Sequence, residues 1–188
     1  MRVIAGSHRG RKLQGPPESV LRPTSDRVRE ALGSILNQRL PGSRFLDLYA
    51  GTGAVGIEAL SRGASHVTYV EMNPQALAIL RRNITACQLT TQTTIYANSV
   101  RHFLQRPEAW GEPFDILFAD PPYDMAYELP GVLMDITDRL LAPHACVVIE
   151  HGRKTVLPTG LGGCALLRRY DYGDTALSLF SNTGPVAS

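Results

Sequence analysis

Residues 47–56 read Asp47-Leu48-Tyr49-Ala50-Gly51-Thr52-Gly53-Ala54-Val55-Gly56, and this stretch decides the fold. Residues 44–49, which include Phe45, Leu46 and Leu48, lead into it and predict a buried strand. A helical pattern over residues 54–62 follows it and ends at Gly63. Glycines after a first strand let the chain turn sharply and let a ligand approach the backbone. The stretch therefore predicts a ligand-binding loop between a strand and a helix, although simple turn chemistry is the alternative.

The chain around this loop alternates between strand and helix patterns. Further strands are predicted at 67–71, 93–97, 114–119 and 145–150. Helices are predicted at 28–36 after the N-cap candidates Thr24-Ser25-Asp26, after Asn73-Pro74, near 100–105, and at 127–140. Residues 165–172 and 175–180 flank Gly173-Asp174 and predict an antiparallel hairpin. The pattern indicates an α/β fold, with a mostly parallel sheet covered by helices on both faces.

The bulk composition is that of one folded domain. The chain has 188 residues, of which 44% are hydrophobic and 19% charged. We expect a single domain over 1–188, with a basic extension at 1–23 that forms a small hairpin, a catalytic core at 24–181 and a flexible tail at 182–188. The three cysteines form no CxxC pair, and the five histidines show no ligand spacing, so we expect no disulfide and no metal. No signal peptide or membrane-length apolar run is evident, and we expect a cytoplasmic protein.

Positive charge is concentrated at the N-terminus. The first thirty residues hold seven Arg or Lys against three Asp or Glu, which is +4 in a chain whose net charge is +2. Such a patch suits a phosphate backbone, although a merely solvated surface is the alternative reading.

Glu71 ends the second predicted strand, so its carboxylate should face the same crevice as the glycine loop. A carboxylate there can accept hydrogen bonds from both ribose hydroxyls of a nucleoside. Gly51-x-Gly53-x-x-Gly56 followed by Glu71 also matches the dinucleotide fingerprint of NAD-dependent oxidoreductases. Asp47 weighs against that reading, because its negative charge would repel a pyrophosphate but would suit a sulfonium ligand or its amino-acid portion.

The fourth predicted strand ends in Asp120-Pro121-Pro122-Tyr123. Two prolines stiffen the loop and remove two backbone donors, which leaves carbonyl acceptors. The Asp120 carboxylate and the Pro121 carbonyl could together hold an exocyclic amino group of a base, and Asp120 could take its proton. Tyr123 offers a face for stacking. These features favour methylation of an amino group over the alternative of a rigid turn.

With these motifs in place, the sequence resembles the bacterial RsmD family, which makes N2-methylguanosine in small-subunit ribosomal RNA. The resemblance covers nearly the whole chain. It is carried by residues 6–13, 22–32, 47–64, 120–123 and 172–175, among them Arg22-Pro23-Thr24 and Tyr172-Gly173-Asp174-Thr175.

The resemblance implies a Rossmann-like methyltransferase fold with seven strands, the last antiparallel, and S-adenosylmethionine as cofactor. It implies that Glu71 binds the ribose and that Asn98 or Ser99 lies near the adenine. The full expected cofactor set is Asp47, Tyr49, Gly51, Thr52, Gly53, Glu71, Met72, Asn98 and Ser99. The implied substrate is 16S ribosomal RNA within an assembled small subunit, contacted by Arg9, Arg11, Lys12, Arg22 and Arg27.

Several alternatives stay open at the level of sequence. Adenine N6 and cytosine N4, in RNA or DNA, present an amino group similar to guanine N2. An NAD-dependent oxidoreductase and a non-catalytic RNA-binding assembly factor are rivals from other classes. We expect a monomer without membrane partners.

Overall fold

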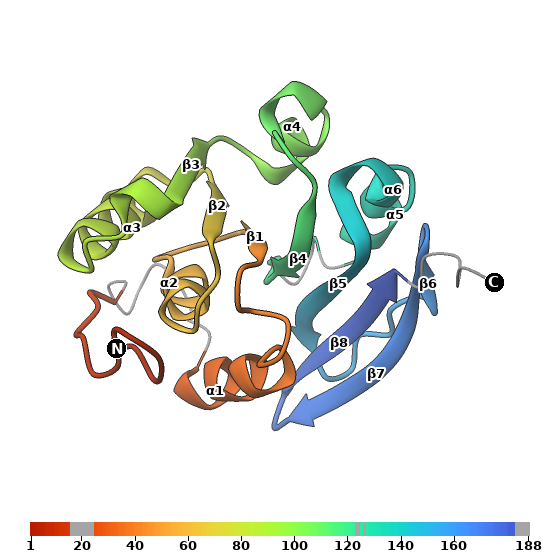
Figure 1. Cartoon of the computed structure of the whole chain (residues 1–188). Coiled ribbons are helices and arrows are strands. Elements are labelled where there is room, and N and C mark those ends of the chain that lie inside the picture. Colours follow the sequence, from red (N-terminus) through yellow and green to blue (C-terminus); the bar gives the residue numbers. More distant parts are fainter. Residues whose placement is uncertain (16–24, 123–124, 126, 183–188) are drawn as a thin grey trace. The chain divides into compact units, whose positions relative to one another are not determined.

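The computed structural model describes residues 1–15, 25–122, 125 and 127–182 (Figure 1). These residues form two compact units, Met1–Val100 and Arg101–Ser188. Within the described part of the chain, no helix is both long and apolar enough to cross a membrane.

Three parallel strands form the sheet of the first unit. They are β1 (Arg44–Leu48), β2 (His66–Glu71) and β3 (Thr93–Ala97), in the order β3-β2-β1. The side chains of Phe45, Leu46 and Leu48 are fully buried because α2 (Ala54–Ser61) packs on β1 and β2. Both strands are buried at every position except their ends and not at alternate positions, as expected for strands that are covered on both faces.

Two helices of the first unit begin at the predicted caps. The Ser25 hydroxyl caps α1 (Asp26–Ile35) by accepting from the Val28 N–H at 3.2 Å. The Asn73 side chain caps α3 (Pro74–Ala86), with Pro74 in its first turn. A short 3₁₀ turn, η1 (Thr90–Gln92), leads into β3. The α1 helix ends at Ile35, before the predicted end at residue 36 and the Pro41-Gly42 turn.

The second unit contains β4 (Phe114–Ala119), β5 (Leu141–Gly152), β6 (Gly160–Leu161), β7 (Cys164–Tyr172) and β8 (Thr175–Asn182). β4 and β5 are parallel, whereas β5 with β8, β8 with β7, and β7 with β6 are antiparallel. Gly173 at φ +63° turns β7 into β8, which confirms the predicted terminal hairpin. α4 (Val100–Leu104) and the 3₁₀ turn η2 (Pro107–Ala109) precede β4.

The predicted α/β class is confirmed, and two details of the prediction are wrong. The described residues contain eight strands rather than seven, because the two-residue β6 was not predicted. The helix predicted at 127–140 is two short helices, α5 (Leu129–Met134) and α6 (Thr137–Leu140). The turn between β6 and β7 packs against this break, where the Gly163 N–H donates to the Thr137 hydroxyl at 3.3 Å. Such a long-range contact leaves no local signal in the sequence.

Candidate functional site

The glycine loop turns through left-handed backbone conformations. Tyr49, Gly51 and Gly53 have φ values of 62°, 54° and 78°, and α2 begins directly after Gly53. The third glycine has another role: a Cβ on Gly56 would lie 2.3 Å from the Tyr69 ring, so Gly56 lets α2 pack closely on β2. A Cβ on Gly51 would meet nothing within 4 Å, so the backbone there stands open for a ligand.

The Glu71 carboxylate joins the glycine loop after β1 to the turn that follows β2. Its Oε2 accepts from the Gly51 N–H at 2.8 Å, and its Oε1 accepts from the N–H groups of Met72 and Asn73 at 2.8 and 2.7 Å. A carboxylate has about four lone-pair sites, and three are filled here. Glu71 can therefore accept one further hydroxyl at Oε2, whereas binding both hydroxyls of a ribose requires one backbone donor to give way.

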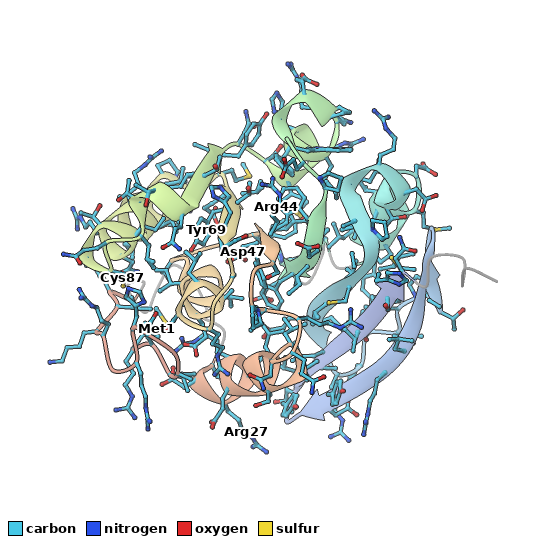
Figure 2. The ribbon with its side chains drawn as sticks, in the orientation of Figure 1. Met1, Arg27, Arg44, Asp47, Tyr69 and Cys87 are labelled. Carbon is cyan, nitrogen blue, oxygen red and sulfur yellow. The ribbon has the colours of Figure 1, made fainter. Side chains whose placement is uncertain are left out.

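Asp47 is 1% exposed and lies beneath the loop rather than at its surface. Its Oδ2 accepts from the Gly56 N–H at 3.0 Å, in the first turn of α2, where the helix dipole favours a negative charge. Burial, followed by the neighbouring Asp47 charge, raises the pKa of Tyr69 well above its ordinary value. Figure 2 shows the two residues in the interior of the first unit. The observed contact of Asp47 stabilises the loop, and its direct contact with a cofactor stays a prediction.

The other predicted cofactor residues of this unit lie around the same strand ends. Glu71 and Ala97 are register partners, so Met72 and Asn98 follow adjacent strands. Met72 is 66% exposed, which is unusual for a large apolar side chain and suits packing against a flat ring. The Asn98 Oδ1 accepts from the Ser99 N–H at 2.8 Å and holds this turn. Thr52 is buried.

Asn83 is a residue of this region that the sequence reasoning missed. It is 2% exposed and lies on α3. Its Nδ2 donates to the carbonyls of Thr52 and Gln14, both at 3.0 Å, and its Oδ1 accepts from the Gln14 N–H at 2.8 Å. One buried amide thus joins the glycine loop to the N-terminal segment. An isolated Asn in a helical pattern gives no signal of such a role.

The N-terminal segment, residues 1–15, is held by a second buried group. It folds back on itself through an antiparallel bridge between Arg2 and Lys12, which confirms the predicted hairpin. The Glu58 carboxylate on α2 accepts from the N–H groups of Ile4 and Ala5 at 2.8 and 3.0 Å. It also accepts from the Arg62 Nε at 2.8 Å.

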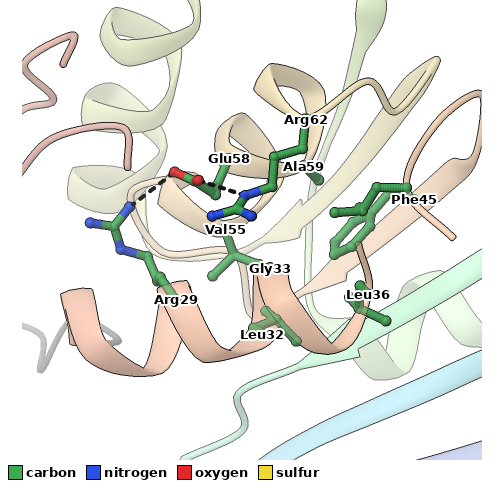
Figure 3. Close-up of a pocket in the computed structure, with 10 residues that line it drawn as sticks. Arg29, Leu32, Gly33, Leu36, Phe45, Val55, Glu58, Ala59 and Arg62 are labelled. Carbon is green, nitrogen blue, oxygen red and sulfur yellow. Dashed lines mark hydrogen bonds and ion pairs between the residues drawn. The ribbon is translucent and has the colours of Figure 1, made fainter. Parts of the chain in front are cut away.

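Arg29 also holds the N-terminal segment in place. It was counted in the positive charge of the N-terminal sequence, but its side chain does not lie at the surface. Its side chain is fully buried, with Nη2 donating to the Arg2 carbonyl at 3.0 Å and to Asp26 at 2.6 Å. Its Nη1 lies 3.9 Å from the Glu58 carboxylate (Figure 3). The cavity beside these groups has a volume of about 10 Å³, which is too small for a nucleoside.

The predicted RNA-binding side chains of the described region are accessible. Arg9, Arg11, Lys12 and Arg27 are exposed, and Figure 2 shows Arg27 pointing away from α1. Arg22 lies outside the described residues.

In the second unit, Asp120-Pro121-Pro122 directly follows β4. Asp120 is half-buried, Pro121 is buried and Pro122 is exposed. The Pro122 carbonyl already accepts from the Met125 N–H at 2.9 Å, so the Pro121 carbonyl is the better candidate acceptor for a substrate. Tyr123 lies outside the described residues.

Among the residues that the structure describes, no three His, Cys, Asp or Glu side chains are grouped to hold a metal ion. The three cysteines are free and buried.

Comparisons with known proteins match the chain over nearly its full length. The model of a family described as "Conserved hypothetical protein 95" matches residues 1–181. Ribosomal RNA small subunit methyltransferase D of Escherichia coli K12 is 34% identical over 96% of this chain and 89% of its own. The protein of that name from Haemophilus influenzae is 33% identical over 97% of this chain and 94% of its own.

Solved structures agree with these sequence matches. The yhhF protein of Escherichia coli superposes with a TM-score of 0.84 at 33% identity and covers 97% of both chains. A hypothetical protein of Thermus thermophilus gives a TM-score of 0.81 at 35% identity, over 95% of this chain and 98% of its own.

Proposed function

Because the chain belongs to the family that includes ribosomal RNA small subunit methyltransferase D, we propose that it methylates guanine N2 in 16S ribosomal RNA. The methyl donor is S-adenosylmethionine, which carries its methyl group on a positively charged sulfur. The family membership, which extends over residues 1–181, is the observation that carries this proposal.

The residues around the glycine loop fit this cofactor. Glu71 keeps one acceptor site for a ribose hydroxyl, and the open backbone at Gly51 leaves room beside it. Exposed Met72 and the turn at Asn98-Ser99 follow neighbouring strand ends and would bind the adenine. The conformation of the loop would depend on four further residues, which need not all contact the cofactor: Asp47, which is buried, Tyr49, Thr52 and Gly53.

Asp120 and Pro121 are the proposed catalytic residues. The lone pair of an exocyclic amino group is delocalised into its ring, so the group is a poor nucleophile. Hydrogen bonds from its two N–H groups to the Asp120 carboxylate and the Pro121 carbonyl would orient the lone pair toward the methyl carbon. As the N–C bond forms and the methyl–sulfur bond breaks, the nitrogen loses a proton, which Asp120 would accept. Pro122 would stiffen the loop, and Tyr123 would stack on the base.

We propose that residues 1–188 act as one methyltransferase domain. We also propose that the protein acts as a cytoplasmic monomer on an assembled small subunit. The exposed Arg9, Arg11, Lys12 and Arg27, together with Arg22, would contact the RNA backbone.

Two binding measurements and one transfer assay test the proposal. Calorimetric titration should give a dissociation constant in the micromolar range or below for S-adenosylhomocysteine, and no binding of NAD. The protein should also transfer a labelled methyl group to small subunits from cells that lack the gene, and the label should be recovered as N2-methylguanosine. Binding of NAD alone would favour the oxidoreductase, whereas label on adenine or cytosine would reject the guanine assignment. Cofactor binding without transfer to any RNA would favour a non-catalytic assembly factor.

A further inference from the structure

The N-terminal segment and α3 together carry only basic formal charge. Residues 1–15 contribute Arg2, Arg9, Arg11 and Lys12, and α3 contributes Arg81 and Arg82. Neither stretch contains Asp or Glu. We call the surface formed by these six side chains the basic face.

The two stretches are adjacent in the first unit although about seventy residues separate them. An Arg11 Nη1 N–H donates to the Ala86 carbonyl in the last turn of α3. One turn earlier, Asn83 holds the backbone of Gln14 through two hydrogen bonds. Figure 1 shows the N-terminal segment beside this end of α3. Arg82 lies four residues before Ala86, so it shares the side of the helix that Arg11 contacts.

All six side chains of the basic face are exposed. None of them forms an ion pair with a described Asp or Glu, and Arg11 bonds only to a backbone carbonyl. Their charges therefore have no direct ion-pair partner in the described part of the protein. Asp26, which lines a hollow together with Arg2 and Arg9, is paired with Arg29. Clustered cations that repel one another without a compensating partner indicate a polyanionic ligand.

The backbone under the basic face is well ordered by hydrogen bonds. α3 has thirteen residues and the capped start at Asn73, and Glu58 and Asn83 fix the N-terminal segment. A rigid array of cations can match the fixed spacing of phosphates, and contacts to phosphate position a protein without distinguishing sequence.

We propose that the basic face binds the phosphate backbone of the RNA substrate, with Arg81 and Arg82 supplying contacts in addition to those of the N-terminal segment. The inference rests on the proposed function for the identity of the polyanion. It adds α3, a helix of the cofactor-binding unit, to the RNA-binding surface.

The salt dependence of binding tests the proposal. The probe is the small ribosomal subunit from cells that lack the gene, and binding of the full chain is measured between about 50 and 300 mM salt. Each lost phosphate contact lowers the slope of log K against log salt by about 0.7–0.9. We expect Arg81→Gln/Arg82→Gln to lower the slope by about 1.5, with unchanged affinity for S-adenosylhomocysteine. Arg81→Lys/Arg82→Lys, which keeps both charges, should restore most of the slope.

A charge-matched control separates local contacts from net charge. Arg101→Gln/Arg106→Gln removes two exposed arginines from the second unit. The proposal is overturned if the Arg81/Arg82 variant keeps the wild-type slope, or if both double variants lower it equally. Methyl transfer by the wild type, assayed on the same subunits, distinguishes a failure of the basic-face proposal from a failure of the proposed function. Transfer with an unchanged slope rejects the basic face alone, whereas the absence of transfer by the wild type rejects the proposed function.

Discussion

At the scale of single residues, the candidate site contains two carboxylates, and the hydrogen bonds that each accepts limit what it can still bind. Glu71 accepts three backbone N–H groups and keeps one acceptor site. The Asp47 carboxylate is buried and accepts a hydrogen bond from the Gly56 N–H in the first turn of α2. The sequence predicted Glu71 as the ribose ligand and Asp47 as a partner of the sulfonium or amino-acid portion. In the structure Glu71 is half-buried, whereas Asp47 is 1% exposed.

Glu71→Gln is expected to weaken S-adenosylhomocysteine binding by about 10- to 150-fold, which corresponds to one lost charge-assisted hydrogen bond. The amide has one acceptor oxygen instead of two, and its NH2 group would face backbone donors, at a cost of about 1.5–3 kcal/mol for each charge-assisted bond lost. Calorimetric titration measures the effect, with the exposed Glu108→Gln as control. Equal affinities of the two variants would remove Glu71 from the cofactor site.

Asp120→Ala is expected to lower kcat by about 10²–10⁴-fold, the usual contribution of a positioned acid–base group. Its affinity for S-adenosylhomocysteine should not change, because Asp120 would contact only the target amino group. Single-turnover transfer to small subunits gives the rate, and calorimetry gives the affinity. A variant with normal turnover would exclude Asp120 from catalysis.

At the scale of elements, Asn83 links α3, the glycine loop and the N-terminal segment. Asn83→Ala leaves the carbonyls of Thr52 and Gln14 and one backbone N–H without this partner, so we expect a loss of about 1–3 kcal/mol in the free energy of unfolding. Urea denaturation measures the loss, with the exposed Asn37→Ala as control. If both variants were equally stable, the buried bridge would not stabilise the fold.

The β5–β8 pair predicts a pH effect through His151. This side chain is buried and lies 2.8 Å from the Ser178 hydroxyl and 2.9 Å from the Gly152 carbonyl. Burial is the main cause that lowers the pKa of His151 from 6.5. Below pH 6.5 the unfolded chain binds a proton that the folded chain does not, so His151 destabilises the fold increasingly as the pH falls toward its native pKa.

His151→Gln should therefore lose less stability than the wild type when the pH is lowered from about 7.5 to about 5.5. Urea titrations at the two pH values measure the difference, and an equal loss in both proteins would show that His151 does not titrate differently on folding.

At the scale of the whole molecule, local signals predicted most elements. Asn73-Pro74, Ser25 and Gly173-Asp174 marked a helix start, a cap and a hairpin because each acts within a few residues. The break before α6 and the anchors at Asn83 and Glu58 could not be predicted, because they depend on partners more than twenty residues away. The family resemblance is confirmed, while the roles of the individual site residues remain proposals that the variants above test.

The central claim is that this chain methylates guanine N2 of small-subunit ribosomal RNA, and mass spectrometry of 16S RNA tests it most directly. RNA from cells with the gene, without it, and with Asp120→Ala in its place is digested and mapped. We predict that one N2-methylguanosine is present only with the wild-type gene. The account is contradicted if the three RNAs carry the same modifications, or if the missing methyl group lies on another base.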